Sequence, residues 1–200
     1  MNENNVEFRP NYQGFMTYPQ SGLHKALFKW PVHLWRLGLA PLIGHHMMLI
    51  THTGRKTGLP RRTMTESYTL GDKKYSPCAF GPRAQWYQNI AVDPRVTIQT
   101  ADGAESATAV RVTDGDEILS LFDAIGNRAQ PMLDLYLEFL DMEPEPADIV
   151  AKKYRAYWLR FDPTDEPTPP PLDADLVWIW PVVLFAAVGI LLAGRKKQRS

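Results

Sequence analysis

The segment 54–62 brings together four cations whose types and spacing could bind an anion. Gly54 and Gly58 bracket the first two, no acidic residue stands among them, and the four are Arg55, Lys56, Arg61 and Arg62. A glycine-bracketed turn offers backbone N–H groups, and arginine binds phosphate and carboxylate groups in bidentate geometry. Because successive strand residues point to opposite faces, we expect only one of Arg61 and Arg62 to lie beside the turn. The alternative is a basic hairpin that is simply solvated.

A tryptophan follows this hairpin in the segment Trp86-Tyr-Gln-Asn89. The residues before it, from Cys78 to Gly81, could bring the backbone close to a flat ring, since glycine permits close approach. The indole of Trp86 could stack on that ring, although it could equally be a core aromatic at the start of a helix. An extended anion with a flat ring at one end would use both the hairpin and Trp86.

Other common catalytic patterns are missing from the sequence. The run Gly54-Arg-Lys-Thr-Gly58 departs from the Walker pattern, which needs a lysine directly after its second glycine, and no G-x-G-x-x-G occurs. The histidines lack metal-ligand spacing, there is no G-x-S-x-G motif, and Cys78 has no evident base partner. Hydride transfer by a bound cofactor needs none of these groups, so the sequence favours a cofactor enzyme over a hydrolase and predicts no metal site.

Hydrophobic periodicity predicts the elements that must position these residues. Apolar and polar residues alternate over 47–53, and further strands are expected over 61–70, 74–79, 95–100, 105–113 and 154–161. Helices are expected over 84–91, over 116–125 after the capping pattern Thr113-x-x-Asp116, and over 132–141. Six strands with few helices predict a small barrel in an α+β domain.

The two ends of the chain differ in composition from this domain. Leucines and Trp30 recur at helical spacing over 23–37, and Pro31 divides them into two short helices that either pack on the core or lie in a membrane interface. Residues 162–175 hold five prolines and five acids, which predicts a stiff solvated linker. Residues 176–194 carry no charge and would reach roughly 28 Å as a helix, which predicts a transmembrane helix. The expected organisation is an N-terminal segment 1–43, a barrel domain 44–161, the linker 162–175, the transmembrane helix 176–194 and a basic tail 195–200.

Charge is distributed unevenly along a chain whose formal net charge is zero. Residues 1–101 hold 12 Lys and Arg against 5 Asp and Glu, whereas residues 102–175 hold 6 against 17, so the front half should carry a basic surface. The lone Cys78 excludes an internal disulfide, and no signal peptide is evident, which indicates a cytoplasmic domain anchored by its C-terminal helix. The basic tail alone would predict the opposite topology, and we give the missing signal peptide more weight.

Three ordered segments carry a resemblance to a known family. They are Leu49-x-x-x-x-Gly-Arg-Lys-Thr-Gly-x-Pro-Arg-Arg-Thr63, Phe80-Gly-Pro-Arg-Ala-Gln-Trp-Tyr-Gln-Asn-Ile90 and Asp93-Pro-Arg-Val-Thr97. These segments closely resemble the deazaflavin-dependent nitroreductases, which are split β-barrel proteins related to the FMN-binding split barrels and use coenzyme F(420). The resemblance implies an α+β split β-barrel with flanking helices, to which the sequence adds one C-terminal transmembrane helix.

The resemblance also implies roles for particular residues. The basic hairpin would bind the phosphate and glutamate tail of the coenzyme through Arg55, Lys56, Arg61, Arg62 and Thr63. The deazaflavin ring would lie beside a second group, which comprises Cys78, Ala79, Phe80, Trp86 and Asn89, with Arg83 reaching the tail or the phosphate. In such enzymes a proton follows the hydride from a tyrosine or from water, and Tyr136 is the expected donor.

The leading hypothesis is an F(420)-dependent oxidoreductase, tethered to a membrane, that reduces a lipophilic acceptor such as a quinone, a nitroaromatic or an activated alkene. One alternative is an FMN-dependent reductase on the same barrel. A second is a non-catalytic membrane module whose hairpin binds anionic lipid. The expected partners are the lipid bilayer, a small lipophilic substrate and a second copy of the chain in a homodimer, with no nucleic acid.

Overall fold

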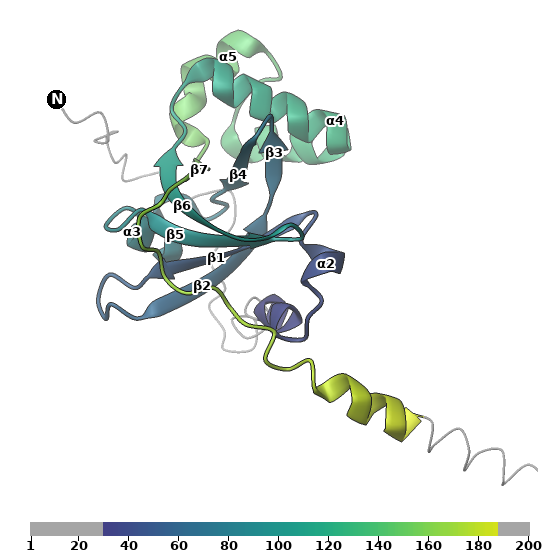
Figure 1. The fold of residues 1–200 in the computed structure, drawn as a ribbon. Coiled ribbons are helices and arrows are strands. Elements are labelled where there is room, and N and C mark those ends of the chain that lie inside the picture. Colours follow the sequence, from purple (N-terminus) through teal and green to yellow (C-terminus); the bar gives the residue numbers. More distant parts are fainter. Residues whose placement is uncertain (1–29, 188–200) are drawn as a thin grey trace, which may run out of the picture.

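The computed structural model describes residues 30–187, and its centre is one antiparallel sheet of seven strands (Figure 1). Their order in the sheet is β2-β1-β5-β6-β7-β4-β3. The bounds are β1 Met47–Thr53, β2 Pro60–Glu66, β3 Tyr68–Leu70, β4 Lys73–Pro77, β5 Arg95–Thr100, β6 Gly103–Arg111 and β7 Trp158–Pro163. β1 and β5 are nearly all buried, because β1 has a partner strand on each side and β5 joins it to β6.

Side chains close this sheet into a barrel. The Ser76 hydroxyl of β4 donates to the Thr65 hydroxyl of β2 (2.9 Å), which in turn donates to the Pro77 carbonyl (3.3 Å). β2 and β4 are far apart in the strand order, so these bonds join one edge of the sheet to its opposite side. The sheet with its flanking helices fits the expected α+β split barrel.

The strand expected over 61–70 is two strands in the structure. β2 pairs with β1 as far as Glu66, whereas β3 begins at Tyr68 and pairs with β4. Between them the Ser67 N–H donates to the His46 carbonyl (2.9 Å), which fixes the point where the chain changes partner. Periodicity could not show this break, because the alternation of side chains continues across it.

Four labelled helices flank the sheet: α2 Ala40–Ile43, α3 Gln85–Ile90, α4 Gly115–Leu140 and α5 Pro146–Lys152. Short 3-10 turns cover Gly81–Arg83 and Lys153–Arg155. The cap of α4 is Asp114, whose carboxylate accepts from the Glu117 N–H (2.9 Å), where the sequence suggested Thr113. The two helices expected over 116–125 and 132–141 are both part of α4, which is kinked at Ala129. The kink lies close to Pro131, because proline removes a helical hydrogen bond.

Two apolar clusters form most of the core. The first fills the barrel, where residues of the strands such as Ile50, Ile98 and Phe161 meet Ile90 of α3. The second lies between α4 and the strands β3, β4 and β7, and Trp158 is its largest fully buried side chain. Figure 1 shows α4 and α5 together over this end of the sheet. The helices therefore cover the sheet at separate places and leave the edge strand β2 beside α3.

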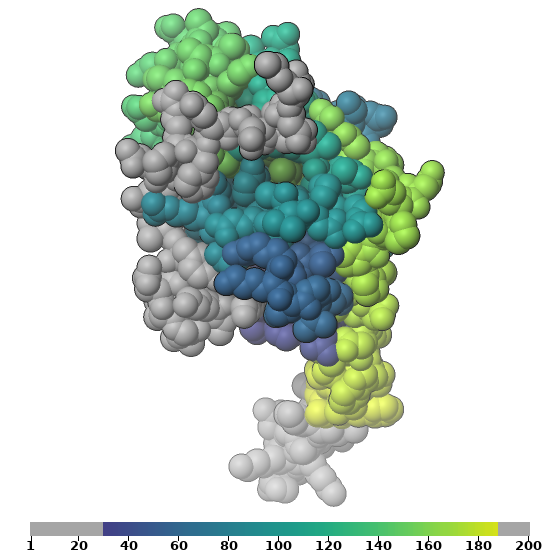
Figure 2. All heavy atoms as spheres, turned by 90° about the vertical axis from the view of Figure 1, so that its left-hand side faces the viewer, coloured from purple at the N-terminus to yellow at the C-terminus, as the bar shows by residue number. Residues whose placement is uncertain are grey.

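The chain after β7 lies against the barrel, and we call residues 164–175 the strap. The side chain of Gln99 on β5 bonds both backbone groups of Leu172, accepting from its N–H (2.7 Å) and donating to its carbonyl (3.1 Å). The Thr168 hydroxyl lies 2.7 Å from that of Thr97 and 2.9 Å from that of Ser106. Figure 2 shows this yellow-green segment along one side of the molecule. Polar side chains of β5 and β6 therefore hold this segment, which lies within the stiff solvated linker predicted from the sequence.

The expected transmembrane helix over 176–194 is not supported. Within residues 30–187, none of the helices combines the length and the apolar character that a bilayer crossing needs. Residues 175–178 form turns in which the Leu176 N–H donates to the Arg36 carbonyl (2.9 Å), while Asp175 pairs with the Arg36 guanidinium (2.6 and 2.8 Å). The helix begins at residue 179. Residues 188–200 and 1–29, including the basic tail and the first expected N-terminal helix, lie outside the described residues.

Candidate active site

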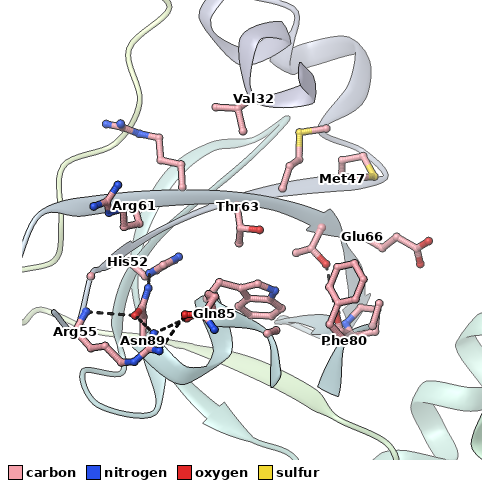
Figure 3. Close-up of a pocket in the computed structure, with 18 of the residues that line it drawn as sticks. Val32, Met47, His52, Arg55, Arg61, Thr63, Glu66, Phe80, Gln85 and Asn89 are labelled. Carbon is pink, nitrogen blue, oxygen red and sulfur yellow. Dashed lines mark hydrogen bonds between the residues drawn. The ribbon is translucent and has the colours of Figure 1, made fainter. Parts of the chain in front are cut away.

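A pocket of about 600 Å³ lies between the edge strand β2, the hairpin that precedes it, and α3 (Figure 3). Register explains its lining: His52 of β1 stands opposite Arg61 of β2, and Ile50 opposite Thr63, so these side chains share the face that α3 covers. Arg62 also lines the pocket, although it points to the other face. The expectation that only one of the two arginines would do so is wrong, because β2 is an edge strand and the pocket reaches around it.

Arg55 fastens the hairpin to α3. Its guanidinium donates to Gln88 Oε1 (2.7 Å), Asn89 Oδ1 (2.8 Å) and Gln85 Oε1 (3.0 Å), and more weakly to the Gln85 carbonyl (3.4 Å). All of these acceptors are neutral, so the positive charge of Arg55 is not cancelled. Its donors are largely occupied by protein, however, and its main structural effect is to hold the turn of the hairpin against the helix.

Asn89 connects this clamp to a buried histidine. Its Oδ1 accepts from both the backbone N–H of Arg55 (3.2 Å) and the guanidinium, so its Nδ2 is the group that donates to His52 Nδ1 (3.3 Å). Burial lowers the pKa of His52 to about 4, the charge of Arg61 acts in the same direction, and a backbone hydrogen bond with Thr53 opposes them in part. At neutral pH the ring is therefore neutral, with Nδ1 as acceptor and its proton on Nε2.

The two ends of the pocket differ in charge. Lys56, Arg61 and Arg62 line one end, and none of them makes an ion pair with an acid among residues 30–187. The other end is bordered by Phe80 and Glu66, which Figure 3 places well away from Arg55 and Arg61. β2 spans this separation, and its seven residues reach about 20 Å at roughly 3.3 Å per residue. The pocket is thus elongated, cationic at one end and largely apolar at the other.

Most of the residues implicated by the sequence lie in this pocket. The lining includes Arg55, Lys56, Arg61, Arg62, Thr63, Ala79, Phe80, Trp86 and Asn89. Arg83 is exposed on the 3-10 turn and is not among the lining residues. Gly81 has φ +55° in this turn, a conformation that glycine adopts without strain, and its N–H donates to the Cys78 carbonyl (2.8 Å).

Cys78 and Tyr136 lie outside the main pocket. The Cys78 side chain is buried, its thiol donates to the Gly81 carbonyl (3.2 Å), and burial raises the pKa of this thiol well above its usual range. The thiol is therefore poorly suited to act as a nucleophile. Tyr136 lines a second, much smaller cavity beneath α4. The pocket brings in residues that sequence reasoning missed, namely His52, Gln85 and Glu66; the position of His52 beside the glycine turn was the one available signal.

The lining suits an elongated anion with a flat ring, which is the chemistry of coenzyme F(420). Lys56, Arg61 and Arg62 would face its phosphate and glutamate tail, and the aromatic side chains of Trp86 and Phe80 would border its ring. Asn89 and Arg55 fix the position of these two regions relative to each other, because their hydrogen bonds link the hairpin to the helix that carries Trp86. The residues present therefore fit this group.

A match to one protein family agrees with this chemistry. Residues 38–136 match the model of the F420H(2)-dependent quinone reductase family. Among solved structures, an F420-H2 dependent reductase (FDR-A) shares 19% identity at a TM-score of 0.44 over 58% of this chain and 93% of that one. A putative pyridoxamine 5'-phosphate oxidase from Listeria innocua shares 14% identity at a TM-score of 0.42, over 64% of this chain and 90% of that one. No curated protein matches the chain.

The matched segment contains the basic hairpin, the turn before α3 and α3 itself, which together build the pocket. The resemblance that the sequence motifs indicated is thereby confirmed at the level of the family. The chain belongs to the F420H(2)-dependent quinone reductase family, whose members are oxidoreductases that use coenzyme F(420).

Proposed function

We propose that this oxidoreductase transfers a hydride from reduced F(420) to a small lipophilic acceptor, with quinones as the first class to test and nitroaromatics or activated alkenes as further candidates. The observation that carries the proposal is the elongated pocket. It joins cations that make no ion pair within residues 30–187 at one end to aromatic and apolar side chains at the other. An anionic cofactor bound through its tail would leave its ring at the apolar end, where a lipophilic acceptor can lie against it.

The cationic end would bind the tail through Lys56, Arg61 and Arg62. Phosphate and carboxylate groups form charge-assisted hydrogen bonds with such side chains, each contributing about 1.5 to 3 kcal/mol where water is excluded and less at an exposed site. All three side chains are exposed, so the binding should weaken as salt screens it. Thr63 offers a hydroxyl between the charged end and the ring.

The apolar end would hold the ring. Trp86 and Phe80 are partly buried lining residues, and Ala79 contributes a small side chain that allows the backbone to approach. Bound reduced F(420) supplies a hydride, and the protein's part is to orient the ring, to exclude water and to provide hydrogen-bond donors. His52 lines the same pocket, and its neutral ring helps to keep Asn89 in place.

The proposal is tested by mixing the full-length protein with reduced F(420) and a soluble quinone and following oxidation of the cofactor. We expect catalytic turnover with F(420), none with reduced FMN at equal concentration, and a loss of turnover at limiting cofactor in Lys56→Met. A protein that oxidises reduced FMN as efficiently as reduced F(420) would contradict the assignment of the cationic end to the tail.

A further inference from the structure

Gln88 lies on α3 and makes hydrogen bonds to segments at both ends of the main pocket. Its Oε1 accepts from the Arg55 guanidinium of the hairpin (2.7 Å), and its Nε2 donates to the Pro82 carbonyl (3.0 Å). Pro82 belongs to the 3-10 turn Gly81–Arg83, which directly follows the lining residue Phe80 of the apolar end. Gln88 itself is not among the described residues that line the pocket, so it acts through the segments that it joins.

The orientation of the Gln88 amide follows from its two partners. A guanidinium has only donors and a carbonyl has only acceptor lone pairs, so the amide oxygen must face Arg55 and the amide nitrogen must face Pro82. Both distances are normal for hydrogen bonds. A glutamate at this position would still accept from Arg55, but its carboxylate has no proton to donate to Pro82 at neutral pH. The two bonds can therefore be separated by substitution.

The turn is held from two sides. At its start the Cys78 N–H donates to the carbonyl of Tyr157, next to β7 (2.7 Å), and the Gly81 N–H donates to the Cys78 carbonyl (2.8 Å). At its middle the carbonyl of the buried Pro82 accepts from Gln88. The first contacts fix the turn on the sheet, whereas the Gln88 contact fixes its position relative to α3 and the hairpin.

Gln85 shares part of this arrangement and lacks the rest. It lies three residues before Gln88, on the same face of α3, and its Oε1 accepts from the same nitrogen of Arg55, Nη2 (3.0 Å). Within residues 30–187 its side-chain nitrogen makes no hydrogen bond to the turn or to any other group. Gln85 thus contacts the hairpin alone, and Gln88 contacts both the hairpin and the turn.

We propose that Gln88 is a positioning residue for the cofactor ring, because it fixes the ring end of the pocket relative to the end that would hold the anionic tail. This inference rests on the proposed function. A cofactor anchored by its tail presents its ring at a set distance, so the wall that Phe80 forms must lie at the matching place. A displaced wall would misorient the ring while the cations of the hairpin still bind the tail.

The structural half of the proposal is tested without cofactor, by hydrogen exchange in full-length Gln88→Met and Gln85→Met. Each substitution removes one acceptor from Arg55, but only Gln88→Met also removes the bond to Pro82. We expect the amides of residues 81–84 to exchange about fivefold faster in Gln88→Met, the factor that corresponds to one lost hydrogen bond. They should exchange at the wild-type rate in Gln85→Met. Equal exchange in the two variants would overturn the proposal.

The functional half is tested with Gln88→Glu and Gln85→Glu. Both place a carboxylate against the same nitrogen of Arg55, so the added charge should weaken F(420) binding by a similar factor in each. Only Gln88→Glu loses the donor to Pro82. At saturating reduced F(420) we expect its turnover of a soluble quinone to fall about tenfold below that of Gln85→Glu, as for a misoriented reactant. The visible circular dichroism of bound F(420) should also change in Gln88→Glu alone.

The outcomes separate this inference from the function on which it rests. If the wild-type protein fails to bind F(420), the proposed function is wrong, and the assignment of Gln88 to the ring is wrong with it. If the wild type binds and turns over while Gln88→Glu matches Gln85→Glu in saturated turnover and in circular dichroism, the positioning role alone is wrong. A loss of stability without these two changes would likewise contradict it, since a purely structural contact would have that effect.

Discussion

Arg55 and Lys56 are neighbours in the hairpin, yet the structure gives them different tasks. Arg55 makes three hydrogen bonds of 3.0 Å or shorter to side chains of α3, whereas Lys56 is exposed and makes no ion pair with a described acid. Replacing each by methionine keeps most of the aliphatic stem and removes the charged group. The comparison of Arg55→Met with Lys56→Met therefore separates the clamp from the anion site.

The expected magnitudes follow from these contacts. Each bond from the partly exposed guanidinium is worth about 1 kcal/mol net, so Arg55→Met should lower the free energy of unfolding by about 2 to 3 kcal/mol. Lys56→Met should change it by less than about 0.5 kcal/mol, as is usual for an exposed side chain. Lys56→Met should nevertheless weaken F(420) binding by about 1 to 1.4 kcal/mol, or roughly five- to tenfold in Kd. Arg55→Met should lose both stability and affinity.

Urea unfolding at fixed pH measures the first quantity, and fluorescence titration with F(420) measures the second. Wild-type stability in Arg55→Met would refute the clamp, because three hydrogen bonds could not be removed without cost if they hold the hairpin. Wild-type affinity in Lys56→Met would refute the placement of the tail at this turn. A loss of stability in Lys56→Met equal to that in Arg55→Met would show that the two residues are not distinguished as described.

Three further predictions concern His52, Trp86 and the strap. The pKa of His52 is lowered to about 4 against about 6.5 in the unfolded chain, so the unfolded state binds the proton first and stability falls as pH drops below about 6.5. Between pH 7 and pH 5 the loss should be about 2 kcal/mol, and His52→Gln should lack it when unfolding is measured at both pH values. Trp86→Ala should weaken F(420) binding by about 0.5 to 1.5 kcal/mol beyond the lost burial, with loss of the tryptophan quenching that the bound ring causes; unchanged affinity would place the ring elsewhere. Gln99→Ala removes both hydrogen bonds to Leu172, so limited proteolysis should cut residues 164–175 faster while F(420) affinity stays the same; equal cleavage would show that Gln99 does not hold the strap.

Local patterns in the sequence predicted the parts of the fold that depend on near neighbours. The strand expected over 95–100 has those bounds in the structure, and the glycine-bracketed turn does join β1 to β2. The break at Ser67 could not be predicted, because it depends on a bond to His46 across the fold. The strap shows the same limit: prolines and acids predict a stiff solvated linker, but the contact between Gln99 and Leu172 depends on the closed barrel.

The transmembrane helix predicted over 176–194 is not supported, because none of the helices within residues 30–187 has the length and apolar character that a bilayer crossing needs. Lack of charge over 176–194 was taken to mean one continuous helix, whereas the chain starts its helix at residue 179 after turns held by Arg36. Arg36 lies far away in the sequence, so no window of neighbouring residues could reveal its pairing with Asp175. Hydropathy is calculated from the residues of one segment, so it contains no information about contacts with distant parts of the chain.

The sequence predicted those residues of the candidate site whose type alone indicates what they could bind. Lys56 and Arg61 predicted an anion-binding site and Trp86 predicted a site for a flat ring, and all three residues line the pocket. His52 and Glu66 carry no such signal, because a histidine or a glutamate in a strand has many ordinary roles. They reach the pocket only through the pairing of β1 with β2 and through the hydrogen bond that joins β2 to β4.

The most direct test of the central claim is a titration of the full-length protein with F(420), with the same deazaflavin lacking its glutamate tail, and with FMN, each at low and at high salt. The proposed site predicts that F(420) binds most tightly at low salt, that removal of the tail weakens binding, and that high salt removes most of this difference, because the exposed cations are screened within about 10 Å at 0.1 M salt. Equal affinity for F(420) and its tail-less form at low salt would contradict the assignment of the cationic end of the pocket to the cofactor's tail.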